Sequence, residues 1–326
     1  MYGMSMGLAA VSGQLIGGLL VQWNPAGLGW RSCFLINVPI GLLGLGIAPK
    51  LVPESREERA SGVDWLGTVL VTTGLTAIVF PLVEGRQHDW PLWTWLSLAA
   101  APVILAGFIW HQRRLTERGG APLLDLSLFK QRAFSAGLVA QAVFWSGQAS
   151  FFLVLALYLQ AGRGMSALHA GLVFTILAGS YLVASARAAE LATRHGRRVL
   201  TVGALTLATG HAVLLGTVAG VGVGGSVFAL APGLLLIGAG MGLGIAPLAT
   251  IIMSAMRPEQ AGAASGALAT MQNVGNAIGV AVIGVIFFGA LRSGYATALE
   301  LSLATLAAIL VAVAALTRLL PATVRS

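Results

Sequence analysis

The strongest constraint on this chain is a series of apolar runs, each long enough to cross a bilayer as a helix. In lipid every backbone N–H and C=O must be satisfied within the protein, so a spanning segment is a helix or a barrel strand. The runs are continuous and lack the alternation of barrel strands. The sequence therefore predicts membrane helices at residues 3–22, 33–52, 63–83, 91–110, 133–157, 167–187, 198–218, 226–252, 263–290 and 298–320.

The composition supports the same class. Charged residues make up 9% of the chain and hydrophobic residues 57%, whereas a soluble domain carries about 25% charged residues. So few charges cannot cover a surface in water. We expect an all-α polytopic membrane protein with about ten transmembrane helices, and we exclude a soluble nucleic-acid-binding protein.

Enzyme chemistry has little support. The spans hold no cluster of nucleophiles or acid–base groups, so no catalytic residue is expected. Cys33 is the single cysteine, which excludes an intramolecular disulfide and a cysteine-based metal site. Neither a metal nor a cofactor is predicted, and a proton gradient is the expected energy source.

The placement of the positive charges predicts the topology. If the first run starts in the cytoplasm, only Arg31, Arg86, Arg163 and Arg292 lie on the opposite side. Lysine and arginine are retained on the cytoplasmic side of membrane proteins. The net charge of +8 is then a topology signal, and both termini are expected in the cytoplasm. The other lysines and arginines fall on that side: Lys50, Arg56, Arg59, Arg113, Arg114, Arg118, Lys130, Arg132, Arg187, Arg194, Arg197, Arg198, Arg257, Arg318 and Arg325.

The chain divides into three segments. Residues 1–60 hold two helices, residues 61–120 hold two more, and residues 121–326 hold six helices with short loops. The stretch Gly13–Gly17 (GQLIG) is echoed at Gly275–Gly279 (GNAIG), each in the penultimate helix of its group. Parallel repeats of this kind relate the two halves of a large class of transporters.

Motifs along the chain resemble those of the major facilitator superfamily, in order and at the right spacing. GQLIGG at Gly13–Gly18 resembles the antiporter motif of the fifth helix, and GWRSCFLINVPIG at Gly29–Gly41 resembles the start of the sixth. DWLG at Asp64–Gly67 resembles the start of an inserted helix pair, and PLLD at Pro122–Asp125 resembles the linker after it. GAASGALATMQNVGNAIGVAVIG, from Gly262, resembles the penultimate helix. The subfamily that this pattern resembles is that of the fourteen-helix drug:proton antiporters.

The resemblance implies a partial major-facilitator fold. Residues 1–60 would be the last two helices of the N-terminal half, 61–120 the inserted pair with its linker, and 121–326 the complete C-terminal half. The implied function is proton-driven export of drugs or other lipophilic small molecules across a bacterial inner membrane by alternating access. The family's first four helices have no counterpart here. The alternative is a truncated, non-transporting membrane protein that needs those helices or a partner chain, or that is inert.

Glycines are the first candidate functional residues. Small residues let two helices approach closely, and the antiporter motif is implied to seal the two halves against each other. Its proline is replaced here by Gln14, so a kink at that position is not expected. The alternative is ordinary helix packing. The candidates are Gly13, Gln14, Gly17, Gly18, Gly275 and Gly279.

Carboxamides inside the spans are the candidate substrate-binding groups. They are costly in lipid, so they face other helices or a watery cavity. Carboxamides mixed with aromatic faces suit large lipophilic cations. Hydrogen bonding between helices is the alternative. One group shares a helical face and the other clusters in the penultimate helix: Gln141, Trp145 and Gln148, and Gln272, Asn273 and Asn276.

Two further sites follow. The loop containing Arg194, Gly196, Arg197 and Arg198 resembles the family's gating motif, although its acidic position is Thr193, so the expected charge pair is lost. Retention of positive charge in the cytoplasm explains these arginines equally well. His211 is the candidate for proton coupling, because histidine titrates near neutrality; a histidine bonded to a carbonyl is the alternative.

Overall fold

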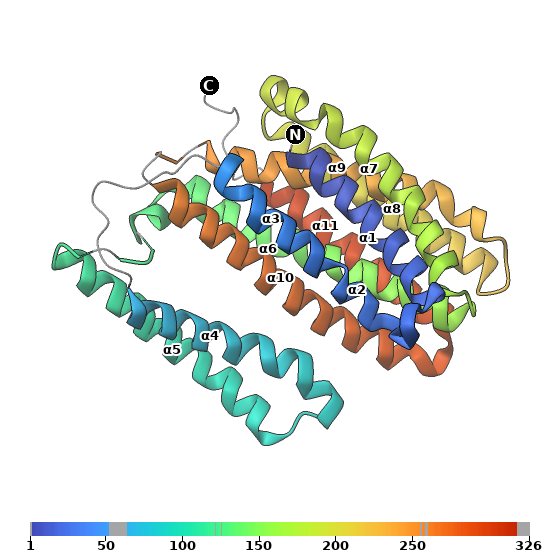
Figure 1. The fold of residues 1–326 in the computed structure, drawn as a ribbon, viewed down its shortest axis with the longest axis horizontal. Helices are drawn as coiled ribbons and strands as arrows, with labels where there is room; N and C mark the ends of the chain where they lie inside the picture. The colour runs from blue at the N-terminus through green and yellow to red at the C-terminus, as the bar shows by residue number, and fades with distance from the viewer. Residues whose placement is uncertain are drawn as a thin grey trace.

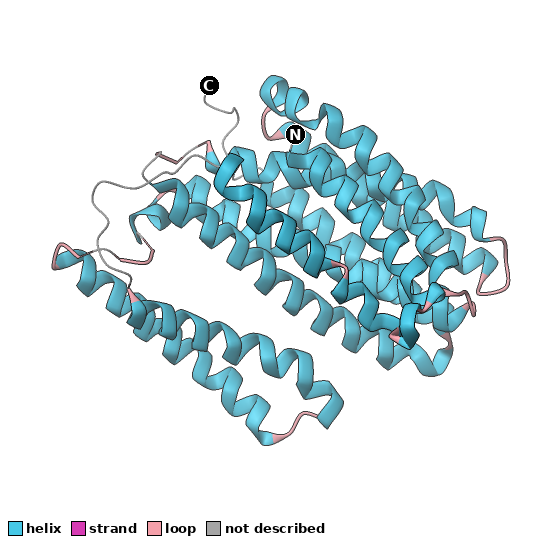
Figure 2. Ribbon diagram, viewed as in Figure 1, coloured by secondary structure: helices cyan, strands magenta, loops and turns pink. Residues whose placement is uncertain are grey.

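The protein is helical throughout the part that is described. The computed structural model describes residues 2–51, 64–120, 122–124, 126–254, 256–257 and 260–317, and no strand occurs among them (Figure 2). Within the described residues, each of the ten predicted apolar runs is mainly helical, and the second is divided into two helices. Within these residues, nine helical segments have the length and low charge needed to cross a membrane. The predicted all-α polytopic membrane fold is confirmed.

Eleven α-helices follow one another among the described residues, and short helical turns join several of them. The structure begins with α1, and a break at Ile36 separates the short α2 from α3. The bounds are α1 (Tyr2–Trp23), α2 (Ser32–Leu35), α3 (Asn37–Leu51), α4 (Trp65–Glu84), α5 (Leu92–Glu117), α6 (Arg132–Leu157), α7 (Ala167–His195), α8 (Arg198–Val221), α9 (Ala231–Met253), α10 (Ala261–Ala290) and α11 (Tyr295–Leu316).

Helices α6 to α11 form one bundle. Helix α9 packs between α7 and α8, α8 also contacts α11, and α6 lies against α10 and α11. Helix α1 lies along α7. Helices α4 and α5 pair with each other and form a separate hairpin beside α10 (Figure 1). The bundle therefore contains residues from 132 onward, with α1 added to its side.

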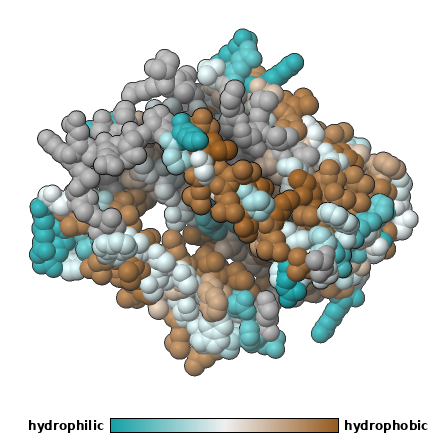
Figure 3. Space-filling view, in the orientation of Figure 1, coloured by the Kyte–Doolittle hydropathy of each residue, from teal (hydrophilic) through white to brown (hydrophobic). Residues whose placement is uncertain are grey.

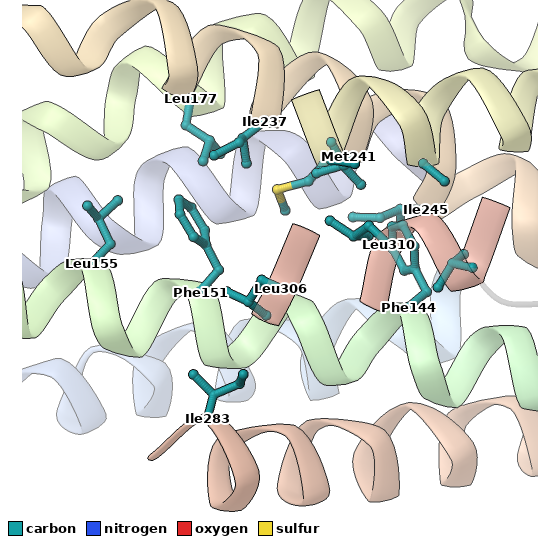
Figure 4. Packing of buried hydrophobic residues seen from close by; sticks show 14 of the residues in the cluster. Phe144, Phe151, Leu155, Leu177, Ile237, Met241, Ile245, Ile283, Leu306 and Leu310 are labelled. Carbon is teal, nitrogen blue, oxygen red and sulfur yellow. The ribbon is translucent and has the colours of Figure 1, made fainter. Parts of the chain in front are cut away.

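The buried core belongs to the same bundle. Phe144, Phe151 and Leu155 of α6 point toward α7 and α9, where Ile237 and Met241 meet them (Figure 4). Helix α3, by contrast, has no buried residue. Hydrophobic residues also cover much of the face in view, with hydrophilic residues at its margins (Figure 3). A surface of this kind fits lipid rather than water.

Glycines in α9 set how closely the bundle packs. A Cβ added at Gly240 would lie 2.7 Å from the Gly203 carbonyl oxygen of α8. A Cβ added at Gly242 would lie 2.7 Å from the Tyr181 carbonyl oxygen and 2.9 Å from the Ser185 nitrogen, both in α7. These neighbours are backbone atoms and cannot rotate away. Helix α9 therefore touches both neighbours at the level of the backbone, as small residues permit in membranes.

We expect Gly242→Val to destabilise the bundle, because its side chain would press on the backbone of α7. Overpacking of this kind costs about 1–3 kcal/mol. Thermal unfolding of the purified protein in detergent measures the effect. Gly216→Val is the matched control, since a Cβ at Gly216 meets nothing within 4 Å. Equal losses of stability in the two variants would contradict the role of backbone contact.

A polar clamp holds the end of the α4–α5 pair where α4 begins and α5 ends. Asp64 caps α4, and its carboxylate accepts hydrogen bonds from the Gly67 N–H (2.8 Å), His111 Nε2 (2.9 Å) and Gln112 Nε2 (2.6 Å). Gln112 Oε1 accepts a hydrogen bond of 3.0 Å from the Leu124 N–H. One carboxylate therefore joins α4 to α5, and Gln112 extends the connection to the linker that leads into α6.

The clamp also shifts the pKa of Asp64. Burial alone would raise this pKa, but the hydrogen bonds from Gly67, His111 and Gln112 outweigh burial and hold it below its usual value. A depressed carboxyl pKa adds stability that is present above the unfolded-state pKa of about 3.9 and is lost as the pH falls through the folded-state pKa. The clamp is therefore complete at neutral pH.

We expect Asp64→Asn to lower stability at pH 7 by about 1.5–3 kcal/mol, the usual worth of hydrogen bonds to a charged group. The difference from the unchanged protein should shrink once the pH falls below about 4. Thermal unfolding across this pH range measures both effects. Asp89→Asn is the control, because Asp89 is exposed and asparagine tolerates its positive φ of 54°. A pH-independent difference would contradict the clamp.

Candidate functional site

The face of α6 predicted to line a cavity lies mostly inside the bundle. Gln141 and Gln148 are 5% and 4% exposed, and Trp145 is half-buried against the core. Gln141 Oε1 is buried and has no hydrogen-bond partner among the described residues. A buried acceptor without a partner is unfavourable by about 1–3 kcal/mol. A hydrogen bond between helices therefore does not explain why the Oε1 atom of Gln141 is buried.

The carboxamides of α10 differ in how deeply they are buried. Asn273 is exposed, and Gln272 and Asn276 are half-buried. The Oδ1 atom of Asn276 is itself buried, again with no hydrogen-bond partner in the described part of the chain. Asn276 directly follows Gly275, where α10 meets α6. Among the described residues, α6 and the adjacent α10 therefore each carry a carboxamide oxygen that is buried without a hydrogen-bond partner.

The glycines of α10 bring these two helices together. A Cβ at Gly275 would clash with the Ala142 carbonyl of α6, and one at Gly279 would clash with the Ser146 carbonyl one turn further along. Both glycines are buried. Gly275 and Gly279 thus lie within the bundle of α6 to α11. The acceptors of Gln141 and Asn276 belong to residues next to this contact.

A small cavity lies elsewhere in the bundle, among α6, α8, α9 and α11. It is almost entirely apolar, and none of the six predicted cavity residues lines it. Next to it, the hydroxyl oxygens of Thr201 and Thr317 lie 2.7 Å apart and join α8 to the end of α11. The cavity is therefore separate from the carboxamides. It is lined by Ala140, Phe144, Leu200, Ala204, Gly244, Leu248, Val313 and Thr317.

The antiporter-like motif on α1 touches α7 at one of its positions. A Cβ at Gly18 would lie 2.8 Å from the Ala167 carbonyl oxygen, at the first residue of α7. A Cβ added at Gly17 would instead lie 3.9 Å from the Cys33 sulfur, and one added at Gly13 would meet nothing within 4 Å. The side chain of Gln14 lies outside the described part. Close approach of α1 and α7 thus depends on Gly18.

The loop predicted to act as a gate is a tight turn between α7 and α8. Gly196 ends α7 with a φ of +55°, which glycine adopts without strain. Thr193 stands at the motif's acidic position, and Arg194 pairs instead with Glu190 one turn earlier in α7, at 2.7 Å. Both side chains are exposed, so the pair contributes little to stability. Arg197 is half-buried and Arg198 is exposed.

His211 is 2% exposed in α8. Its Nδ1 lies 2.7 Å from the Leu207 carbonyl oxygen, and its ring contacts Phe151 of α6 at a centroid distance of 5.0 Å. Since a carbonyl oxygen only accepts, Nδ1 carries the hydrogen. Nε2 is then an acceptor, and it is buried with no partner among the described residues.

Two polar features were not predicted. Glu300 is half-buried within α11. The helix begins at Tyr295, before the predicted run, so Glu300 is further from the helix end than expected.

The second feature lies where α6 ends. Tyr158 and Arg163 both donate hydrogen bonds to the Gly222 carbonyl oxygen, at 2.6 Å and 3.5 Å. Tyr158 begins a π-helical turn, which the hydrophobic pattern does not reveal. The π turn brings the α6–α7 loop against the α8–α9 loop.

The fold and these polar positions define a polytopic membrane protein with a bundle of six helices that holds buried carboxamides. Residues 1–280 match the Major Facilitator Superfamily. The chain therefore belongs to this superfamily, as its motifs predicted.

Its relatives include proteins named as exporters. The chain is 38% identical over 279 residues to the "Probable actinorhodin transporter" of Streptomyces coelicolor, covering 84% of this chain and 48% of the relative. It is 31% identical over 282 residues to the "Tetracenomycin C resistance and export protein" of Streptomyces glaucescens (83% and 49%). It is 30% identical over 272 residues to "Multidrug resistance protein Stp" of Mycobacterium tuberculosis (82% and 48%). The chain spans about half the length of these curated relatives.

We expect Gly18→Val to push α1 away from α7 by about 1 Å, because the new methyl groups need ordinary van der Waals distance from the Ala167 carbonyl. Spin labels on the exposed positions Leu19 and Leu172 would report the separation, with Cys33 replaced by alanine. Gly13→Val serves as the control. An unchanged distance in the Gly18 variant would contradict the contact.

Proposed function

We propose that this chain is part of an exporter of lipophilic small molecules that works by alternating access. The proposal includes membership of the fourteen-helix drug:proton antiporters, with both termini in the cytoplasm of a bacterial inner membrane. Membership of the superfamily and the printed names of the relatives support export. The chain covers about half of each relative, and transport by this chain is part of the proposal.

The observation that carries the proposal is the pair of unsatisfied acceptors on α6 and α10. Gln141 Oε1 and Asn276 Oδ1 are buried without a hydrogen-bond partner among the described residues. A substrate with N–H or O–H groups would satisfy them and offset the unfavourable burial. Trp145, on the same face of α6 as Gln141, would offer an aromatic surface to a lipophilic cation.

The same proposal assigns proton coupling to His211. The hydrogen bond to Leu207 fixes the Nδ1–H tautomer, so Nε2 is the atom that would take up a proton. The contact between the His211 ring and Phe151 joins it to α6, the helix that carries Gln141 and Gln148. Protonation would place a charge in an apolar core, which favours rearrangement of these helices. A proton gradient is thus the proposed energy source.

We expect the chain to extrude a cationic dye from an efflux-deficient bacterial host in a manner that an uncoupler abolishes. Gln141→Leu should slow extrusion by about tenfold, because one hydrogen bond to substrate of about 1.4 kcal/mol is lost. Gln160→Leu removes an exposed carboxamide that follows the same helix, and it should extrude normally. Equal rates for the two variants would argue against a substrate site at Gln141.

A second reading is a membrane partner that does not transport alone. It is favoured by the length match, since the chain spans about half of its relatives. Co-expression with the portion of the Streptomyces coelicolor relative that this chain does not match separates the two readings. Extrusion only in the co-expressing host supports the partner, and extrusion by the chain alone supports autonomous transport. Absence of extrusion in both hosts would contradict an exporter.

A further inference from the structure

Five exposed cations gather where α5 ends and α6 begins. Arg113, Arg114 and Arg118 lie at the end of α5, and Lys130 and Arg132 flank the start of α6. No ion pair involving these five side chains occurs among the described residues, whereas Arg194 does pair with Glu190. Glu117 is the acidic residue of this part of α5. We refer to these five residues as the basic belt.

The fold brings the two parts of the belt together. Gln112 of α5 is fully buried, and its Oε1 accepts a hydrogen bond from the Leu124 N–H in the linker. The linker then forms η4 (Leu126–Lys130), which contacts α5 and leads directly into α6 (Figure 1). Lys130 and Arg132 are therefore held at the same end of the molecule as the arginines of α5. The belt is a product of tertiary structure as well as of sequence.

An aromatic side chain places the belt relative to the membrane. Trp110 is 60% exposed, and the guanidinium of Arg114 lies 5.1 Å from the centroid of its ring. Trp110, Arg114 and Arg118 are spaced four residues apart and so share one face of α5. Exposed tryptophan prefers the boundary between acyl chains and headgroups. The arginines one and two turns further along α5 then lie at the level of the lipid phosphates.

A second aromatic residue belongs to the other part of the belt. Phe129 of η4 is 42% exposed and directly precedes Lys130. Arginine forms a planar fork that matches phosphate, and lysine supplies a point charge. A soluble anion would use the cations alone, whereas a phospholipid would use the cations and the aromatic surfaces together. The combination favours lipid.

We propose that the basic belt binds the headgroups of anionic phospholipids in the cytoplasmic leaflet. The proposal rests on the cytoplasmic orientation given under the proposed function, but not on transport. The bound lipids lie between the end of α5 and the start of α6, and so help to hold the α4–α5 pair beside the bundle. Protein contacts between this pair and the bundle are made mainly by α4 with α10, while α5 contacts η4 of the linker.

The test uses the full chain in vesicles of phosphatidylcholine with or without phosphatidylglycerol. After extraction, native mass spectrometry counts the phospholipids that remain bound. The unchanged protein should retain phosphatidylglycerol in preference to phosphatidylcholine. R113Q/R114Q/R118Q should reduce that preference by about tenfold or more, since each cation adds to the attraction of an anionic surface. R31Q/R292Q removes two exposed arginines predicted on the other side, and it should retain the preference.

A second variant and a competition with inorganic phosphate complete the test. K130Q/R132Q should weaken retention as well, and it leaves α5 intact if the triple variant fails to fold. Inorganic phosphate at matched concentration should displace no lipid; displacement would identify a soluble-anion site and overturn the proposal. Equal retention of the two lipids by the unchanged protein would also overturn it. None of these readouts depends on dye extrusion, so failure of transport and failure of lipid binding are distinguishable.

Discussion

Backbone contact between helices, permitted by glycine, is the interaction on which the rest of this structure depends. Lipid supplies no hydrophobic force between helices, so membrane helices associate through close packing and polar contacts. Gly240 and Gly242 bring α9 against α8 and α7, and Gly275 and Gly279 bring α10 against α6. Gln141 and Asn276 directly adjoin the contacts between α10 and α6, and their carboxamide oxygens are buried.

The helices themselves were predictable because lipid imposes a simple rule. A lipid-spanning run that is long, continuous and apolar is expected to be helical, and the described part of each of the ten runs is mainly helical. The interfaces could not be predicted in the same way, because glycines are common in this chain and the pattern does not show which ones meet a backbone. Gly13 and Gly18 belong to one motif, yet Gly13 has open space around it and Gly18 lies against α7.

The polar contacts show the same limit. Asp64 was expected only near a helix end, but its carboxylate binds His111, 47 residues away. That pairing depends on how α4 and α5 turn back on each other, which hydrophobicity does not specify. Thr193 replaces the acidic residue of the gating motif, and Arg194 pairs instead with Glu190, one helical turn earlier in α7. Helical spacing could have indicated this pair, because residues four apart are neighbours.

The proposed function depends on buried polar groups that the helix packing leaves without a hydrogen-bond partner. Most buried polar groups in proteins have partners, and the clamp at Asp64 follows that rule. The acceptors of Gln141, Asn276 and His211 depart from it among the described residues. Two of them lie on α6 and α10, and the third contacts α6 through Phe151. The proposed substrate site and the proposed proton site would then both contact α6.

The central claim is that the unsatisfied acceptors on α6 and α10 bind a lipophilic ligand. Its most direct test is equilibrium binding of a fluorescent lipophilic cation to the purified chain, followed by fluorescence polarisation. We expect saturable binding that is about tenfold weaker when Gln141 or Asn276 is replaced by leucine. Affinities that do not change in either variant, or the absence of saturable binding to the unchanged chain, would contradict it.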